Sequence, residues 1–219
     1  MNNSKRITDY KLLTKNDVFE ILKKYDLNSK KPIPEYAKEI KEQIILKNYQ
    51  NLIIDCFCGV GESTYKLAQK YPEYLVIGFD KSFNRLKRKN SFKEKSFNNL
   101  LLFQSDIFDF YQILKELTEK VGLKVIKQYV LYPNPWPKKK NAKKRIYLNN
   151  VIPYLFYQAC EIEIRSNWGR LLVEFSFSAE YYNFDYVFEK IVAKNPLTPF
   201  EKKYYLSGQN LNRLLLKPR

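Results

Sequence analysis

Short apolar runs alternate with longer amphipathic segments through most of this chain. The apolar runs predict buried strands over residues 52–54, 75–79, 100–103, 128–132 and 171–175. The segments between them predict helices over residues 62–70, 82–90, 107–120, 147–164 and 179–193. Strands that alternate with helices predict an α/β fold, with a mainly parallel sheet and helices on both faces. Residues 204–217 predict a C-terminal antiparallel hairpin at one edge of that sheet.

The organisation of the chain is that of one α/β domain behind a polar lead-in. A chain of 219 residues is long enough to bury a core of its own. Residues 1–50 are rich in lysine, are interrupted by Pro32 and Pro34, and carry a helical pattern over 35–46. We therefore expect an N-terminal helical and basic segment over 1–50 and the main domain over 51–219.

The formal net charge is +16, from 39 Lys and Arg against 23 Asp and Glu. A charge of this size favours a polyanionic partner, either nucleic acid or an anionic membrane surface, and a lysine-rich composition alone is a second explanation. Residues 1–15 lack the apolar core of a secretory signal, and the longest uncharged stretch, 146–160, is shorter than a membrane span. We expect a cytoplasmic protein, monomeric or homodimeric, with no membrane partner.

The sequence contains no histidine. This excludes Ser-His-Asp and Cys-His catalytic sites and imidazole ligands to a metal. The spacing of Cys56, Cys58 and Cys160 matches neither a zinc site nor a redox pair. We expect reduced, buried cysteines and no metal site, so any proton transfer has to use a carboxylate, Lys, Tyr or water.

A glycine-containing loop follows the first predicted strand. Asp55 follows the apolar run of that strand, Gly59 and Gly61 come next, and a predicted helix begins at residue 62. Open α/β sheets bind ligands at the carboxyl ends of their strands, where glycine lets the backbone approach a ligand closely. The spacing predicts a cofactor loop, and a tight turn without a ligand is the second interpretation.

Two further carboxylates follow the next two predicted strands. Asp80 lies about 20 residues after Gly61, where a carboxylate meets the ribose of a nucleotide in such folds. Asp106 is placed either to meet an adenine edge or to cap the helix that begins at residue 107. Because Thr64 stands where a dinucleotide fold prefers a third small residue, we favour S-adenosylmethionine (SAM) over NAD as the cofactor.

The segment 132–145 begins Tyr-Pro-Asn-Pro-Trp-Pro and continues as a basic run. Its three prolines at alternate positions predict a stiff, extended loop that presents Trp136 at the rim of the sheet, beside the cofactor. Six of the eight residues from 138 to 145 are basic, and such a run beside an aromatic ring suits RNA phosphates and a stacked base. The expected phosphate contacts, whose affinity falls steeply with salt, include Lys138, Lys139, Lys143 and Arg145.

These elements resemble the class I SAM-dependent methyltransferases, and specifically the bacterial tRNA (guanine-N7)-methyltransferases. That family has an acidic-x-G-x-G-x-G loop, an acid after the second strand, a F/Y-P-D-P-W-P-K loop before basic residues, and T-x-Y/F-E followed by a glycine near the C-terminus. The resemblance spans about residues 50–219. The matching residues are Asp55 with Gly59 and Gly61, Asp80, Tyr132 to Lys138, and Thr198 to Glu201 with Gly208.

The resemblance implies a Rossmann-like class I methyltransferase fold, SAM as the cofactor and tRNA as the partner. The implied reaction is methyl transfer to N7 of a guanine in the variable loop of tRNA. Asn134 then takes the catalytic position, and Trp136, Thr198 and Glu201 contact the substrate. A turn before the last strands is the alternative role of Thr198 and Glu201.

Three positions depart from the family pattern. Phe57 replaces the first glycine, Asn134 replaces Asp, and Ser176-Phe177-Ser178 stands where Thr-Asp is expected after the fifth strand. Asn134 also fits the Asn-Pro-Pro-aromatic loop of methyltransferases that act on adenine N6 or guanine N2. Two alternative hypotheses are therefore an amino-methyltransferase of nucleic acid and a non-catalytic RNA-binding protein that retains the fold.

Overall fold

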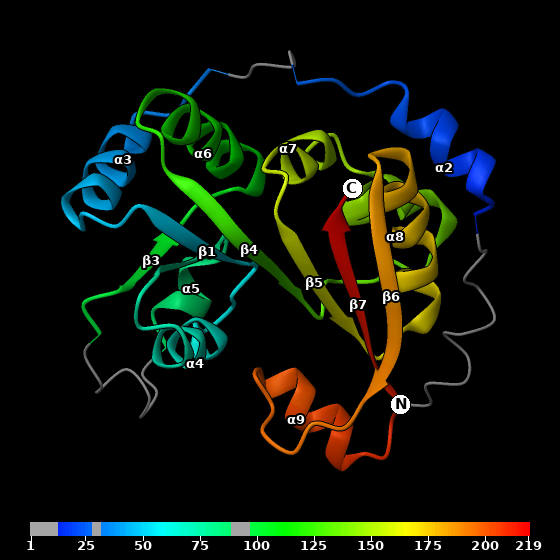
Figure 1. Ribbon diagram of the computed structural model, residues 1–219. Helices are drawn as coiled ribbons and strands as arrows, with labels where there is room; N and C mark the ends of the chain where they lie inside the picture. The colour runs from blue at the N-terminus through cyan, green and yellow to red at the C-terminus, as the bar shows by residue number, and fades with distance from the viewer. Residues whose placement is uncertain (1–12, 28–31, 89–96) are drawn as a thin grey trace.

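A seven-stranded sheet forms the centre of the molecule in a computed structural model, which describes residues 13–27, 32–88 and 97–219 (Figure 1). The strand order across the sheet is β3-β2-β1-β4-β5-β7-β6. Strands β1 to β5 are parallel to one another, whereas β7 runs antiparallel to both β5 and β6. The strands are β1 (Asn51–Cys56), β2 (Leu75–Asp80), β3 (Leu100–Gln104), β4 (Lys124–Leu131), β5 (Glu161–Ser166), β6 (Phe184–Ile191) and β7 (Leu211–Pro218).

Helices cover both faces of the sheet (Figure 1). On one face, α4 (Glu62–Lys70) packs Leu67 and Ala68 against Ile53 and Val76. The larger core lies on the opposite face, under α2 (Lys15–Leu22), α3 (Tyr36–Leu46), α6 (Ile107–Lys120), α7 (Ile152–Tyr157) and α8 (Gly169–Tyr181). The other described helical segments are α5 (Phe83–Leu86), α9 (Pro199–Leu206), η2 (Lys139–Lys144) and η3 (Ile146–Leu148).

The larger core includes residues from the N-terminal segment. Val18 and Leu22 of α2, and Ile40 and Ile44 of α3, are buried with the strand residues. The described part of residues 1–50 therefore packs onto the main domain. Within the described ranges, no helix combines the length and the apolar character that crossing a membrane requires.

The α/β class, the mainly parallel sheet and its first four strands are confirmed. The central strands β1 and β2 are buried almost throughout, which explains why each contains a continuous apolar run in the sequence. β3 lies at the edge of the sheet and is only partly buried. The helices predicted over 35–46, 62–70 and 107–120 are also confirmed. The helix predicted from residue 82 is shorter than expected, since α5 ends at Leu86, and residues 89 and 90 lie outside the described ranges.

The prediction was wrong between residues 147 and 193. The helix predicted over 147–164 is replaced by η3, α7 and strand β5, and the strand predicted over 171–175 lies inside α8. The helix predicted over 179–193 is replaced by the end of α8 and by strand β6. In β5, isoleucines face the larger core and charged residues face the other side, so the true period is two.

The C-terminal antiparallel hairpin is confirmed, but its strands are Phe184–Ile191 and Leu211–Pro218, so it begins earlier than residue 204. Strands β6 and β7 pair with each other, and α9 lies in the connection between them. The shift of the fifth strand to Glu161–Ser166 also corrects one departure from the family pattern. Ser166 ends β5 and Asn167 follows it, whereas Ser176-Phe177-Ser178 lies in α8.

The strand order reverses between β1 and β4. From β1 the chain proceeds to β2 and β3 on one side, and from β4 it proceeds to β5 on the other. Loops at the carboxyl ends of β1 and β4 therefore diverge and leave space for a ligand, which is the binding position in open α/β sheets. The glycine-containing loop and the Pro-Asn-Pro-Trp-Pro segment are these two loops.

Candidate active site

The loop after β1 requires glycine at two positions for different reasons. Gly61 has φ +88°, and a Cβ there would lie 2.9 Å from Leu102 Cδ1. Gly59 has φ +63°, and a Cβ there would meet nothing within 4 Å. Gly61 therefore serves the packing of the loop, whereas the space around Gly59 is open to a ligand.

Phe57 occupies the position of the missing first glycine and keeps a glycine-like backbone. Its φ is +59°, in the left-handed region that costs a non-glycine residue on the order of 1 kcal/mol. The ring is half-buried against the larger core, with its centroid 6.3 Å from that of Phe79. The substitution thus preserves the turn of the loop and adds an aromatic ring beneath it.

Asp55 is fully buried and retains unused acceptor capacity. Its Oδ2 accepts hydrogen bonds from Ser63 Oγ at 2.6 Å and Thr64 Oγ1 at 2.7 Å. Its Oδ1 has no hydrogen-bond partner among the described residues. Helix α4 comes this close because β2 carries Gly78, where a Cβ would lie 2.3 Å from Thr64 Oγ1. A buried carboxylate oxygen without a partner is suited to a cationic or N–H donor of a ligand.

Burial raises the pKa of the Asp55 carboxyl from 3.8 to about 6, against the two hydroxyl hydrogen bonds, which lower it. The folded protein then holds this proton to a higher pH than the unfolded chain does. Relative to Asp55→Asn, we expect the wild-type free energy of unfolding to fall by about 3 kcal/mol between about pH 4 and pH 6. Urea denaturation of both proteins across this range measures the difference, and parallel pH profiles would contradict it.

Asp80 ends β2 beside the same loop. Its Oδ2 accepts from the Gly59 N–H at 3.0 Å, and its Oδ1 accepts from the Ser82 N–H at 2.7 Å. The Arg85 guanidinium lies 2.9 Å from Oδ1 and is about half exposed. Asp80 therefore holds the glycine loop in place through the Gly59 N–H. Of the three partners just described, Arg85 is the one that bonds through its side chain, and as a surface residue it can be displaced by a ligand.

Asp106 has the geometry of a helix cap. Its Oδ1 accepts from the Phe108 N–H at 3.0 Å at the start of α6, and Lys81 Nζ lies 3.2 Å from its Oδ2. Capping was one of the two roles considered for Asp106. The contact with an adenine edge stays a prediction.

The loop after β4 is held in a strained conformation. Tyr132 has φ +53° and Trp136 has φ +43°, both in the left-handed region. Asn134 is exposed, and its Oδ1 accepts from the Trp136 N–H at 3.2 Å. Lys144 Nζ lies 4.8 Å from the centroid of the Trp136 ring, a cation–π contact. Backbone strain of this kind is retained at functional sites when the surroundings impose it.

Arg145 anchors the Trp136 end of this loop. Its side chain is 1% exposed, its Nε lies 3.3 Å from the Trp136 carbonyl oxygen, and its Nη2 lies 3.4 Å from that of Pro137. Its Nη1 pairs with the Glu174 carboxylate of α8 at 3.0 Å. Arg145 was expected to contact RNA phosphates, but the structure places it beneath the loop. Sequence reasoning missed Glu174, because nothing in the local pattern links the two positions.

Among the basic side chains of the segment that the structure describes, Lys138, Lys143 and Lys144 are exposed. The side chains of Lys139 and Lys140 lie outside the described part of the structure. Lys138 is the last residue of the strained loop. Lys143 and Lys144 lie in η2, which follows it. The surface next to Asn134 is therefore cationic, and it stays so without Arg145.

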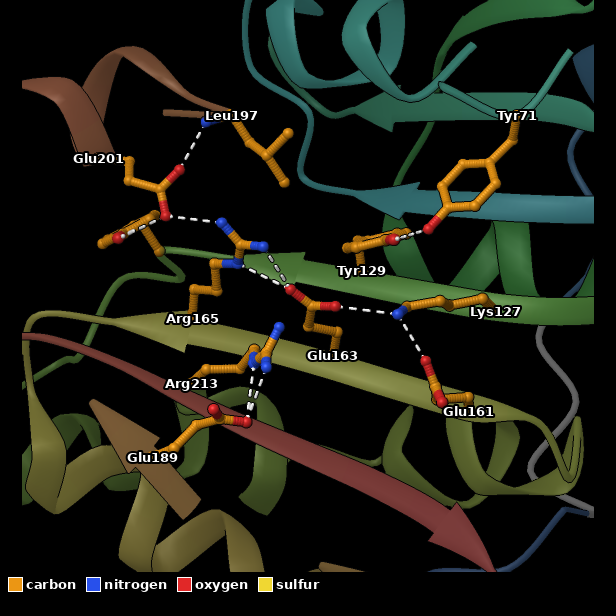
Figure 2. A network of polar contacts seen from close by, with 11 residues as sticks. Tyr71, Lys127, Tyr129, Glu161, Glu163, Arg165, Glu189, Leu197, Glu201 and Arg213 are labelled. Carbon is orange, nitrogen blue, oxygen red and sulfur yellow. Dashed lines mark hydrogen bonds and ion pairs between the residues drawn. The ribbon is translucent and has the colours of Figure 1, made fainter. Parts of the chain in front are cut away.

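Glu201 joins α9 to the carboxyl ends of β4 and β5 (Figure 2). The carboxylate is fully buried, and its Oε1 accepts from Arg165 Nη1 at 2.9 Å and from the Tyr132 hydroxyl at 3.1 Å. Its Oε2 accepts from the Leu197 N–H at 2.5 Å. Thr198 caps the helix by accepting from the Glu201 N–H at 3.0 Å. Both residues have structural roles, Thr198 as the cap and Glu201 as a buried member of helix α9, where the alternative interpretation expected a turn. Their contact with a guanine stays a prediction.

The network around Glu201 continues along β5 and was not foreseen from the sequence (Figure 2). Arg165 pairs with Glu163 at 2.6 Å, and Glu163 pairs with Lys127 of β4 at 2.9 Å. Burial raises the pKa of Glu163, but the Arg165 and Lys127 charges outweigh burial, so the net shift is downward. The alternation of Glu161, Glu163 and Arg165 with isoleucine was the signal for this strand.

The segment before α9 packs against helix α4. Lys66 of α4 donates to the Pro196 carbonyl oxygen at 2.8 Å, and Leu197 packs against the core beneath α4. Helix α4, which follows the cofactor loop, and Tyr132, which begins the loop after β4, are thus both connected to α9 or to the segment before it. These connections lie at the carboxyl ends of the strands, next to the strand-order reversal.

This strand order, with a glycine loop at the reversal and an acid ending β2, defines the fold of the class I methyltransferases. Solved structures with this fold include an antibiotic-related methyltransferase (TM-score 0.54, 17% identity, 84% of this chain and 96% of that one). Another is the 16S rRNA (adenine(1408)-N(1))-methyltransferase of Catenulisporales acidiphilia (TM-score 0.53, 17% identity, 80% of this chain and 89% of that one). At this identity the likeness shows the fold alone.

Residues 49–214 match the model of the methyltransferase family described as "Putative methyltransferase", and the chain belongs to that family. Among curated relatives, the tRNA (guanine-N(7)-)-methyltransferase of Brevibacillus brevis is 26% identical over 76% of this chain and 80% of its own. The enzyme of the same name from Thermotoga maritima is 26% identical over 72% of this chain. That match spans 51% of the Thermotoga protein, about half its length.

Proposed function

We propose that this protein transfers the methyl group of SAM to N7 of a guanine in tRNA. The observation that supports the proposal is the placement of two loops on the two sides of the strand-order reversal, at the same end of the sheet. One loop is built around Gly59 between the carboxylates Asp55 and Asp80, and the other presents Asn134 and Trp136 beside exposed lysines. The curated relatives named above support the choice of tRNA and of guanine N7.

The residues present fit SAM. Asp55 Oδ1, which has no hydrogen-bond partner in the described ranges, suits the ammonium of the methionine part. The open space at Gly59 lets the backbone approach SAM, and Asp80 suits the ribose hydroxyls. When bound, SAM supplies a methyl group on a sulfonium sulfur. The transfer of this methyl group to an acceptor is a single displacement that needs neither a metal nor a base. The chain then has to hold donor and acceptor in line.

The chemistry of guanine N7 agrees with a chain that lacks histidine. The N7 lone pair forms the bond to the methyl carbon while the carbon–sulfur bond breaks, and the pair of that bond stays on sulfur. No proton is removed, and the purine becomes cationic. Asn134 offers an amide dipole where this charge develops, and Trp136 offers a ring face to a base once Lys144 moves aside.

The proposal is tested by incubating the protein with labelled SAM and unmodified bulk tRNA, followed by nucleoside digestion and mass spectrometry. Label in N7-methylguanosine is expected. Label in N6-methyladenosine or N2-methylguanosine would overturn it in favour of an amino-methyltransferase, the hypothesis that Asn134 motivates. Binding of both SAM and tRNA without any label would instead indicate a non-catalytic RNA-binding protein.

A carboxylate in place of Asn134 is expected to speed the chemical step. Asn134→Asp keeps an oxygen that accepts the Trp136 N–H, so the loop is preserved while a negative charge faces the developing cation. We expect the single-turnover rate to rise by about 10-fold, in keeping with about 1.4 kcal/mol of electrostatic stabilisation. Rapid-quench measurement with excess enzyme tests this, with Asn134→Ala as the control expected to be slower than wild type. An unchanged or lower rate for Asn134→Asp would refute the assigned role.

A further inference from the structure

Helix α9 inverts the usual distribution of side chains on a surface helix. Among the residues of α9, Glu201 is the one that is buried. The large apolar residues are turned outward, with Phe200 52% exposed, and Tyr205 and Leu206 also exposed. A helix normally buries its aromatic side chains and exposes its carboxylates. This inversion leaves aromatic surface in water beside the candidate active site.

The aromatic rings form a row that leads into the active-site loop. Phe200 and Tyr204 are stacked, with centroids 6.3 Å apart and planes inclined by 23°. The Tyr204 ring lies 5.7 Å from the ring of Tyr132, which directly precedes Pro133 and Asn134 in the chain. The row therefore begins at the exposed Phe200 ring and ends at the base of the loop that carries Asn134.

The polar network beneath α9 holds this row in place. The Tyr132 hydroxyl donates to Glu201, and Glu201 is paired with Arg165 (Figure 2). Burial and the Glu201 carboxylate raise the pKa of Tyr132 well above its ordinary value, so its hydroxyl remains a donor. Rings that are fixed before binding lose little conformational entropy when a partner stacks on them.

The charges around the row favour nucleic acid over protein as the partner. Lys202 and Lys203 are exposed on α9 itself, and Lys138 is exposed at the end of the neighbouring loop. Aromatic rings interleaved with lysines are the combination that binds unpaired nucleotides, since rings stack on bases and lysines contact phosphates. The net charge of +16 is of the same sign.

We propose that Phe200 is a stacking platform for an unpaired nucleobase of the RNA, next to the base that enters the active site, with Lys202 and Lys203 contacting its phosphates. This inference rests on the proposed function and adds a second base contact to it. Stacking on an aromatic side chain contributes about 1–3 kcal/mol per base and tolerates any base. The platform therefore selects unpaired structure in the RNA, and it does so without selecting a sequence.

The test compares Phe200→Ala, Phe200→Trp and the control Phe188→Ala, which removes a 43% exposed ring from the edge strand β6. We expect Phe200→Ala to weaken the binding of unmodified tRNA by about 10-fold or more and to leave SAM affinity unchanged. Phe200→Trp and Phe188→Ala should bind as wild type does. A single-stranded RNA containing 2-aminopurine should be quenched by wild type and Phe200→Trp, and much less by Phe200→Ala.

The outcomes separate this inference from the proposed function. If the wild type methylates tRNA but Phe200→Ala matches it in affinity and quenching, the platform is refuted and the methyltransferase stands. If the wild type binds and quenches RNA without methylating it, the function fails while the platform stands. Loss of SAM affinity in Phe200→Ala would show a structural role of the ring and would overturn the proposal.

Discussion

Replacing Glu174 with alanine is expected to lower the free energy of unfolding by about 3–5 kcal/mol. Glu174 is 0% exposed and pairs with Arg145, which is 1% exposed, at 3.0 Å. It also accepts from the Tyr147 hydroxyl and, at 2.9 Å, from the Leu13 N–H. Removing the carboxylate leaves a cation and two donors in the interior without their acceptor. Chemical denaturation of the two proteins at neutral pH measures the difference.

A double variant separates the effect of an unpaired buried charge on stability from the effect of lost side-chain volume. Arg145→Met with Glu174→Leu removes both charges and should be less destabilised than Glu174→Ala, because no unpaired charge remains. Glu180→Ala, on the same helix but in an exposed pair with Lys15, should cost less than about 1 kcal/mol. If Glu174→Ala were as mild as Glu180→Ala, the anchoring role given to Arg145 would be wrong.

The second large effect is expected at Asp80, where Asp80→Asn should weaken SAM binding by about 100-fold or more. Two charge-assisted hydrogen bonds to ribose hydroxyls contribute about 1.5–3 kcal/mol each, and the neutral amide can accept only one of them. The amide also loses its pairing with Arg85. Isothermal titration calorimetry with SAM gives the affinity, and thermal unfolding reports the stability of the same variant.

Arg85→Ala is the matched control, because it removes the same ion pair from the other side. Arg85 is about half exposed and pairs with Oδ1 of Asp80 at 2.9 Å. We expect this variant to bind SAM as tightly as the wild type or more tightly. Equal weakening in Arg85→Ala and Asp80→Asn would show that the pair maintains the loop and that Asp80 does not contact the cofactor.

The first half of the fold was predictable because its central strands β1 and β2 are buried almost throughout. Each contains a continuous apolar run, and turn residues separate these strands from amphipathic helices. The same rule failed in the second half. Residues 171–175 form an apolar run, but they lie in α8, which is buried on most of its surface. An apolar run alone does not distinguish a buried helix from a buried strand.

β5 and β6 were missed for the opposite reason. Their charged residues made them resemble amphipathic helices, although the charges of β5 alternate with apolar residues. β6 lies at the sheet edge and has no such alternation. The charges of β5 are tolerated in a sheet because they neutralise one another and meet Glu201 of α9. This depends on contacts between segments that are distant in sequence, so a local pattern does not reveal it.

The candidate site also contains residues whose positions the sequence predicts and residues whose positions it does not. The positions of Gly59, Asp80 and the proline-rich loop follow from the ends of strands, which the sequence marks clearly. Which of several consecutive basic residues turns inward does not follow from sequence, since Arg145 differs from its lysine neighbours by its pairing with α8. A planar guanidinium can bond a carboxylate and two carbonyls at once, and this explains why the buried member is the arginine.

The position of β7 between β5 and β6 has a consequence for synthesis on the ribosome. β6 leaves the exit tunnel before β7 does, yet β6 pairs with β7. The outer edge of β5 also pairs with β7, so it stays unpaired until β7 is synthesised. At 5–20 residues per second, two unpaired strand edges are exposed for on the order of seconds. Their apolar residues make a nascent chain stalled before Leu211 a ready target for chaperones and for aggregation.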